Sequence, residues 1–261
     1  MFRLDFNPID FAREQKLRVV ILEAPYDTYQ SAETRNLLSS TAALKLAGYQ
    51  KEYPYGVLPI DTTDFFANHM LLCRENGSSL TPVMGMKTVS LLRCQLHNMK
   101  LPVFNLINGQ DLPLHLRAME RILESAMLSN QEVGYNGSWT IDPLVRQDKD
   151  LKQFARALTV SWFVHYYREY GIPNVFAGAT LRFKVEQWKE FLGFEYLQSE
   201  GQSLPSIDCK PFFSERVAIM CLRKVRPEAD LWARAFLPLW KSRLTVGHAV
   251  DVRELLARKA A

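Results

Sequence analysis

Residues 135–142 read YNGSWTID, a strand-like run that is followed by a charged loop, LVRQDKD, at 144–150. A long helical pattern comes next, and then a second strand-like run, NVFAGA at 174–179, a second helix and Gly193-Phe194. A strand that leads into a helix places unpaired backbone N–H groups and the positive end of the helix dipole at one spot. This order of elements suits the binding of a phosphate-bearing carrier.

The bulk composition narrows the class of protein. At 261 residues and 48% hydrophobic content, the chain can bury one substantial core with a small appendage. Its 32 Lys and Arg against 28 Asp and Glu give a net charge of +4, which fits an anionic ligand but is too small and dispersed to indicate nucleic-acid binding. The four cysteines form no C-x-x-C pair, which argues against zinc or disulfides. With no signal-peptide pattern and no membrane-span run, we expect a cytoplasmic protein.

Local patterns predict alternating strands and helices along the whole chain. In the N-terminal part they predict a strand at 18–24, a helix at about 30–46 that Gly48 ends, an ordered loop at 49–66, and a hairpin of 69–75 and 82–92 around Asn76-Gly77. Beyond it they predict an irregular segment at 94–112, a helix from Pro113 with Leu116 on its core face, and a strand at 132–142. A helix whose capping box is Asp150 and Gln153 follows. The remaining predicted elements are a strand at 174–179, a helix at 181–192, and strands at 194–198 and 214–224. We expect the strand at 135–141 to run beside that at 174–179 and then to diverge, leaving a cleft near Asp150.

The order of elements over residues 18–224 resembles the GNAT superfamily of N-acyltransferases, which implies an α/β fold with a mixed sheet. Residues 1–226 are interpreted as this acyltransferase domain. Residues 227–261, an aromatic-rich segment followed by a charged helix, are interpreted as a C-terminal helical extension outside the core pattern.

The N-terminal half resembles, more narrowly, the autoinducer (acyl-homoserine-lactone) synthases and the N-acyl amino acid synthases. The resemblance is carried by Arg35, Gly48-Tyr49, the pair Asp61 and Asp64, His69, and Gly85-Met86-Lys87. Lys87 stands where those families have arginine, and their Glu-x-Ser-Arg motif falls at 136–139, where only Ser138 is kept. Both glycines of the superfamily's phosphate loop are missing near 146–151. The resemblance implies that Arg35, Lys87 and Ser138 bind a small-molecule amine.

On the donor side, the resemblance implies no permanently bound cofactor and an acyl thioester as co-substrate. The pantetheine arm is expected to pair with the backbone of Trp139, Thr140 and Ile141 as an added strand. Around the helix start, the candidate phosphate contacts are Arg146, Lys149 and Lys152. Asp148 and Asp150 at the same place repel the several phosphates of coenzyme A. This slightly favours an acyl carrier protein as the donor, and acyl-CoA stays open as the alternative.

Three residues are candidates for acid–base chemistry, namely Asp64, Asp61 and His69. The two carboxyls precede Phe65-Phe66, and partial burial there is expected to raise the pKa of one of them. Lys189 occupies the place of the tyrosine that protonates the thiolate in many GNAT acetyltransferases. It is interpreted as a solvated helix charge, and the alternative is that the lysine itself supplies a proton. The leading hypothesis is an N-acyltransferase acting on an amino acid or a derivative. The alternative is a catalytically inactive GNAT-like module for ligand binding or protein interaction.

Overall fold

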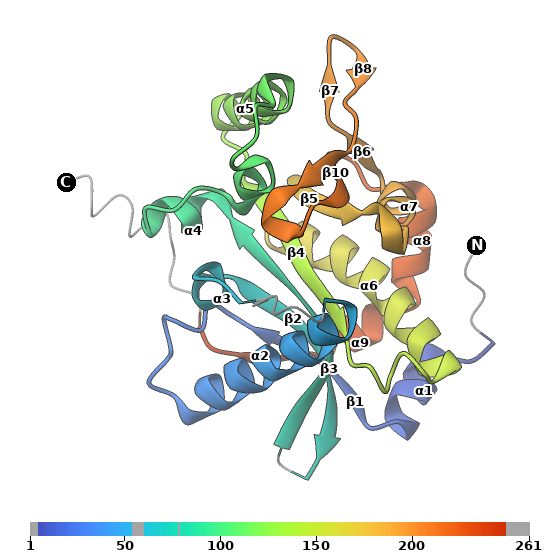
Figure 1. Cartoon of the computed structure of the whole chain (residues 1–261). Coiled ribbons are helices and arrows are strands. Elements are labelled where there is room, and N and C mark those ends of the chain that lie inside the picture. Colours follow the sequence, from blue (N-terminus) through green and yellow to red (C-terminus); the bar gives the residue numbers. More distant parts are fainter. Residues whose placement is uncertain (1–4, 54–59, 78, 249–261) are drawn as a thin grey trace.

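A nine-stranded mixed sheet forms the centre of the computed structural model, which describes residues 5–53, 60–77 and 79–248 (Figure 1). The strands are β1 (Leu17–Leu22), β2 (Asn68–Asn76), β3 (Ser79–Ser90), β4 (Val133–Ile141), β5 (Asn174–Thr180), β6 (Phe194–Tyr196), β9 (Ile207–Cys209), β10 (Glu215–Leu222) and β11 (Leu244–Val246), with β7 (Gln198–Ser199) and β8 (Gln202–Ser203) in a separate hairpin. The helices are α1 (Pro8–Glu14), α2 (Ala32–Glu52), α3 (Thr63–Phe66), α4 (Leu91–Leu96), α5 (Pro113–Leu128), α6 (Lys149–Glu169), α7 (Val185–Leu192), α8 (Pro227–Arg234) and α9 (Leu237–Lys241). Three short 3₁₀ helices are η1 (Pro102–Ile107), η2 (Leu181–Phe183) and η3 (Lys210–Phe212).

The strand order in the large sheet is β11-β1-β2-β3-β4-β5-β10-β6, with β9 paired to β10. Most neighbours are antiparallel, whereas β4 and β5, and β1 and β11, run parallel. The mixed sheet predicted from the sequence is therefore confirmed.

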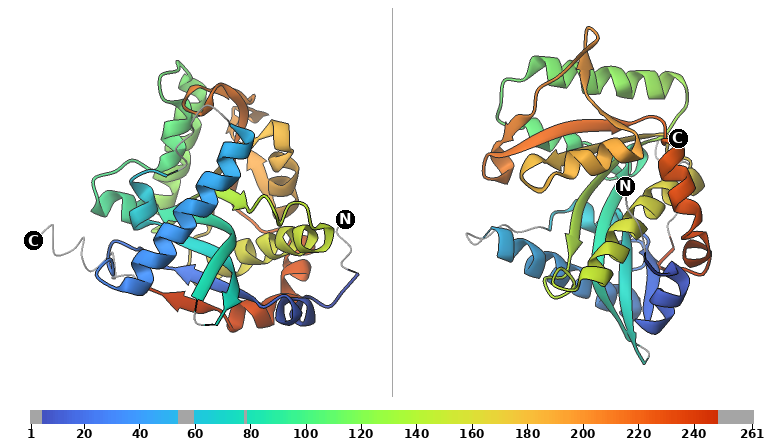
Figure 2. Two further views of the ribbon diagram at one scale, coloured as in Figure 1. Left: turned by 60° about the horizontal axis from the view of Figure 1, so that its bottom comes forward. Right: turned by 90° about the vertical axis from the view of Figure 1, so that its right-hand side faces the viewer.

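The two faces of the sheet are covered by different helices, as the two views in Figure 2 show. Successive strand side chains point to opposite faces, so that Val19 and Ile21 of β1 join the same hydrophobic cluster as Phe154 of α6. The alternate residues Val20 and Leu22 pack with Leu37 of α2. A continuous apolar run such as that of β1 is what a strand buried on both faces requires.

The strands β4 and β5 separate partway along their length. They pair from Val133 with Asn174 to Asn136 with Ala177, and no further. Beyond that point β4 continues along β3 to Ile141, while β5 continues along β10 to Thr180. The predicted divergence of these two strands is confirmed, and it opens a gap in the middle of the sheet.

The N-terminal elements follow the prediction except at Gly48 and in the loop expected at 49–66. Part of that loop, residues 54–59, lies outside the described residues, and α3 forms its end. The hairpin of β2 and β3 turns at Gly77, whose φ of 61° is the left-handed conformation that glycine adopts readily. Gly48 does not end the helix, because α2 continues to Glu52. A Cβ at Gly48 would lie 2.4 Å from Cγ2 of Thr140, so this glycine lets α2 pack closely against β4.

Other local predictions needed correction where distant contacts decide the structure. Helix α6 is capped by Asp148, whose Oδ1 accepts from the backbone N–H of Leu151 at 2.9 Å, and not by Asp150. The segment at 94–112 contains the end of α4 and all of η1, and Leu116 is exposed. The helix expected at 181–192 is split into η2 and α7 by Lys184, which has a φ of 55°.

The C-terminal segment is helical in α8 and α9, but the prediction that it lies outside the core is wrong up to residue 246. Ala229, Phe236 and Trp240 belong to the main hydrophobic cluster, and β11 extends the sheet beside β1. The charged helix predicted after it falls outside the described residues. Of the helices in the described ranges, none has the length and apolar character needed to cross a membrane.

Candidate active site

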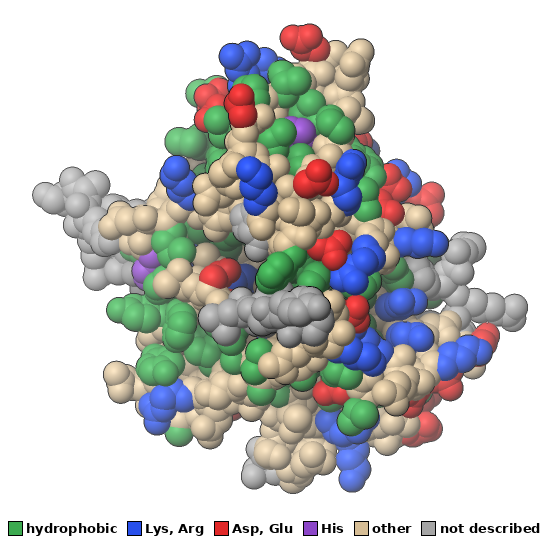
Figure 3. Space-filling view, in the orientation of Figure 1, with side chains coloured by type: hydrophobic (Ala, Val, Ile, Leu, Met, Phe, Trp, Pro, Cys, Tyr) green, Lys and Arg blue, Asp and Glu red, His purple; other side chains and the backbone are tan. Residues whose placement is uncertain are grey.

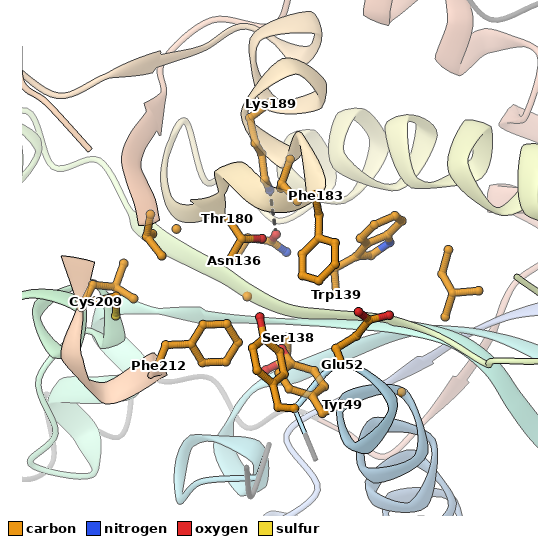
Figure 4. Close-up of a pocket in the computed structure, with 18 of the residues that line it drawn as sticks. Tyr49, Glu52, Asn136, Ser138, Trp139, Thr180, Phe183, Lys189, Cys209 and Phe212 are labelled. Carbon is orange, nitrogen blue, oxygen red and sulfur yellow. Dashed lines mark hydrogen bonds between the residues drawn. The ribbon is translucent and has the colours of Figure 1, made fainter. Parts of the chain in front are cut away.

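A cavity of about 600 Å³ lies where β4 and β5 separate (Figure 4). Its lining comes from both faces of the sheet, including Tyr49 on α2, Leu106 on η1, Trp139 on β4 and Lys189 on α7. The gap between the two strands therefore connects the α2 side of the sheet with the α7 side.

A bulge in β4 shapes the wall of this cavity. Gly85 of β3 pairs with Thr140 and Lys87 pairs with Gly137, which leaves one extra residue on β4. Ser138 in the bulge has a φ of 56°, and it lines the cavity together with Gly137 and Trp139. Because β5 has already turned away, the β4 edge facing the cavity has no partner strand at these residues.

Lys189 is a buried lysine on the α7 wall of the cavity. Its Nζ donates to Oδ1 of Asn136 at 3.0 Å, the last β4 residue paired with β5, and the side chain is 7% exposed (Figure 4). The rings of Phe163 and Phe194 lie 4.0 and 4.6 Å from Nζ. Burial holds the pKa of Lys189 well below its usual value, and no carboxylate of the described chain forms an ion pair with it. The interpretation of Lys189 as a solvated charge is therefore wrong.

Asp64 lies at the centre of a buried charge cluster beside the cavity. One carboxylate oxygen accepts from Nζ of Lys45, and the other accepts from Nζ of Lys87 at 2.8 Å. Burial alone would raise the pKa of Asp64, but the charges of Lys45 and Lys87 bring it well below its usual range. The pKa rise that was expected for one of the two carboxyls therefore does not occur at Asp64, and Asp64 does not line the cavity. Its contacts are those of an anchor for two lysines.

Of the three acid–base candidates, only Asp61 lines the cavity. Its Oδ1 accepts from Lys87 Nζ at 2.9 Å and from the backbone N–H of Thr63 at 2.7 Å. His69 is fully buried, with Nε2 2.7 Å from the carbonyl oxygen of Asp64, and burial lowers the pKa of its ring to about 4. A histidine in this position is neutral near pH 7 and has no contact with the cavity.

Basic side chains gather beside the cavity, on the right-hand side of the face in Figure 3. Those that line it from the start of α6 and the loop before it are Arg146, Lys152 and Arg156. Arg146 is already engaged, because it donates to Glu52 at 2.7 Å and to the carbonyl oxygen of Ile141 at 3.0 Å. Lys152 and Arg156 form no ion pair with a carboxylate in the described ranges.

The other predicted binding residues separate into those that reach the cavity and those that do not. Trp139, Ile141, Arg146, Lys152 and Ser138 line it. Thr140 of β4 is buried, with its methyl group against Gly48 of α2, and Lys149 is exposed. Lys87 is held in the charge cluster, and Arg35 donates to the carbonyl oxygens of Tyr29 and Gln30.

Sequence reasoning missed an aromatic wall at the α2 end of the cavity. Its lining residues there are Tyr49, Tyr53, Tyr135 and Phe212. The ring of Phe212 lies 4.7 Å from that of Tyr53 and 6.0 Å from that of Tyr49, which brings η3 onto the end of α2. These residues come from segments that are far apart in the chain, so no local pattern groups them.

Comparison with known proteins identifies the fold. No protein-family model and no curated protein matches the sequence. Among solved structures, the CoA-dependent acyl-homoserine lactone synthase BjaI, with SAM and isopentyl-CoA, matches with a TM-score of 0.52 at 11% identity over 94% of this chain and 100% of that chain. The acyl-homoserine lactone synthase LasI gives 0.51 at 12% identity over 89% and 98% of the two chains. The chain therefore has a GNAT-like fold of the autoinducer-synthase type, as its sequence resemblance implied.

Proposed function

We propose that the protein is an N-acyltransferase that moves an acyl chain from a phosphopantetheine thioester to a small amine. The observation that carries this proposal is the cavity at the divergence of β4 and β5, which is lined by an unpaired strand edge and by a buried lysine. A solved protein of the same fold, BjaI, holds SAM and isopentyl-CoA, which supports two substrates in one site of this type.

The unpaired edge of β4 at Gly137–Trp139 suits the pantetheine arm of the donor. Pantetheine contains amide groups, so it can add to a free strand edge through backbone hydrogen bonds. The basic residues Lys152 and Arg156 lie at the start of α6, where they can meet the phosphate of this arm. Asp148 already caps the helix, so the phosphate relies on side-chain charges more than on free backbone N–H groups.

The chemistry needs no covalent enzyme intermediate. The amine nitrogen attacks the thioester carbonyl, the new C–N bond forms as the C–S bond breaks, and the proton lost by the amine ends on the departing thiolate. Lys189 is suited to relay that proton, because burial lowers its pKa and a lysine with a lowered pKa gives up and takes back a proton more readily than an exposed one. Asn136 holds its Nζ at the point where the strands part.

Between the two donor classes, the capped helix and the Glu52–Arg146 pair favour an acyl carrier protein over coenzyme A. Both features reduce the positive field available to a ligand. A carrier-bound phosphopantetheine has one phosphodiester, whereas coenzyme A adds a pyrophosphate and a ribose phosphate. The carrier-bound donor therefore needs fewer free cations in the site.

Thiol release tests the proposal directly. All four cysteines of this chain are buried, so a thiol reagent will report mainly the released donor. We expect amine-dependent release from an acyl carrier protein or acyl-CoA, and a loss of roughly 10²-fold in kcat for Lys189→Met. Lys241→Met on α9, outside the cavity lining, is the matched control. A folded protein that releases no thiol from either donor would instead support the ligand-binding module.

A further inference from the structure

Asp61 offers one free carboxylate oxygen to the cavity. Its Oδ1 is occupied by Lys87 and by the backbone and hydroxyl of Thr63. Its Oδ2 accepts no hydrogen bond from any residue in the described ranges. The side chain is 57% exposed and lines the cavity, so a ligand can reach this oxygen.

The cations on the same side are already committed. An ammonium group has three protons, and those of Lys87 are directed to Asp61, to the Thr63 hydroxyl at 2.7 Å and to Asp64. Lys45 is held by the other oxygen of Asp64. This cluster contains two ammonium groups and two carboxylates, so its formal charge is zero and it does not attract an anion.

Among the described residues, aromatic side chains line the same end of the cavity as Asp61. Tyr49 and Tyr135 both lie close enough to Asp61 to feel its charge, and both line the cavity with Tyr53 and Phe212. Aromatic faces attract organic cations, and the tyrosine hydroxyls, which can donate a hydrogen bond, carry no positive charge that would balance a carboxylate. An acceptor that bears a carboxylate next to its amine would place that group near Asp61, where like charges repel.

The cavity lining also contains basic residues, and one of them, Arg146, lies beside Tyr49 at the aromatic end. Arg146 is paired with Glu52, and Lys152 and Arg156 belong to the start of α6, where we place the donor phosphate. Lys189 lies on α7 between two phenylalanine rings. An amine held by Asp61 has its α-carbon substituents within about 4 Å of the nitrogen, so an α-carboxylate would remain in the aromatic end.

We propose that the acceptor is an organic cation without an α-carboxylate: a primary amine on an aromatic or apolar body, with its ammonium group on Oδ2 of Asp61. This inference rests on the proposed acyl transfer and names the class of amine. It differs from the amino acid acceptor that the sequence resemblance implies.

Matched pairs of amines test the inference. The pairs are phenethylamine with phenylalanine and tyramine with tyrosine, and phenylalanine methyl ester supplies an amine whose carboxyl charge is removed. Each compound is measured twice, by calorimetric binding without a donor and by kcat/KM for thiol release. We expect at least a tenfold preference for the amine over its amino acid in both measurements, and we expect the ester to behave like the amine.

Variants show whether Asp61 causes the preference. Asp61→Asn should weaken amine binding at least tenfold and reduce the discrimination against amino acids. Asp10→Asn is the matched control, because the Asp10 side chain is also 57% exposed and lies outside the cavity lining. The ratio of the affinity for an amine to the affinity for its amino acid can be compared between variants even if overall turnover is low.

The outcomes separate this inference from the proposed function. Amino acids that bind or react as well as their amines, or an Asp61→Asn variant with unchanged amine affinity, would overturn the inference. Failure of every amine to bind would overturn it as well. Selective amine binding without thiol release from any donor would refute the acyltransferase proposal and would still support the recognition of cationic amines.

Discussion

Replacing Asp64 by Asn should lower the free energy of unfolding of the protein and leave its turnover nearly unchanged. The carboxylate bridges Lys45 and Lys87, and the side chains of all three residues are at most 3% exposed. Removing one partner of a buried ion pair leaves an uncompensated charge, at a cost of about 3–5 kcal/mol. Part of this cost is avoided if Lys45, whose pKa burial already lowers, gives up its proton. We therefore expect a loss of roughly 3 kcal/mol in the free energy of unfolding.

The assay is urea denaturation followed by the fluorescence of the five tryptophans, with turnover measured on the same preparation. Asp61→Asn is the control for stability, because that carboxylate is largely exposed, and its loss should cost less than about 1 kcal/mol. The two variants should thus have different effects. Asp64→Asn should lower the free energy of unfolding, and Asp61→Asn should lower the affinity for amines.

The pH dependence of stability provides a second readout. The folded pKa of Asp64 is depressed, so its contribution is complete above the unfolded value of about 3.9 and is lost as the pH falls below it. Asp64→Asn should therefore flatten the acid side of the stability curve. A variant with parental stability but turnover reduced a hundredfold would refute this reasoning and restore Asp64 as the catalytic base.

Three further predictions concern the cavity and its frame. If Lys189 accepts a proton, kcat should rise with pH through a midpoint well below the usual lysine pKa, and Lys189→Met should lack this rise; a rise that persists in the variant assigns it to another group. Gly48→Ala places a methyl group 2.4 Å from Thr140, so the free energy of unfolding obtained from a thermal melt should fall by about 1–3 kcal/mol. An unchanged melting temperature would mean that α2 shifts without cost. Arg146→Ala should weaken donor binding, measured as the donor KM, by about 1–3 kcal/mol. Glu52→Gln removes the carboxylate that pairs with Arg146 and should strengthen donor binding. Donor KM values unchanged in both variants would exclude Arg146 from the phosphate site.

The sequence by itself determined the order and type of most elements, because the signals that set them are local. Asn76-Gly77 favours a tight turn, and Pro113 is suited to the first turn of a helix because its φ is already fixed near the helical value. The strands on either side of the long helix were predicted from apolar runs of the right length. Their order resembles that of the GNAT superfamily, and this resemblance implied the mixed sheet and the divergence of β4 from β5.

The tertiary structure alone decided which of the candidate residues meet in the cavity. Asp61 and Asp64 are three residues apart and look alike in the sequence, yet Asp64 is enclosed by two lysines from other elements while Asp61 keeps one oxygen open. Lys189 reads as a surface charge on a short helix until Asn136 and two aromatic rings enclose it. Burial and charge pairing depend on contacts between residues 19 to more than 50 positions apart, as for Lys45 with Asp64 and Lys189 with Asn136. A local pattern contains no information about such contacts, and they are what set the pKa and the accessibility of each group.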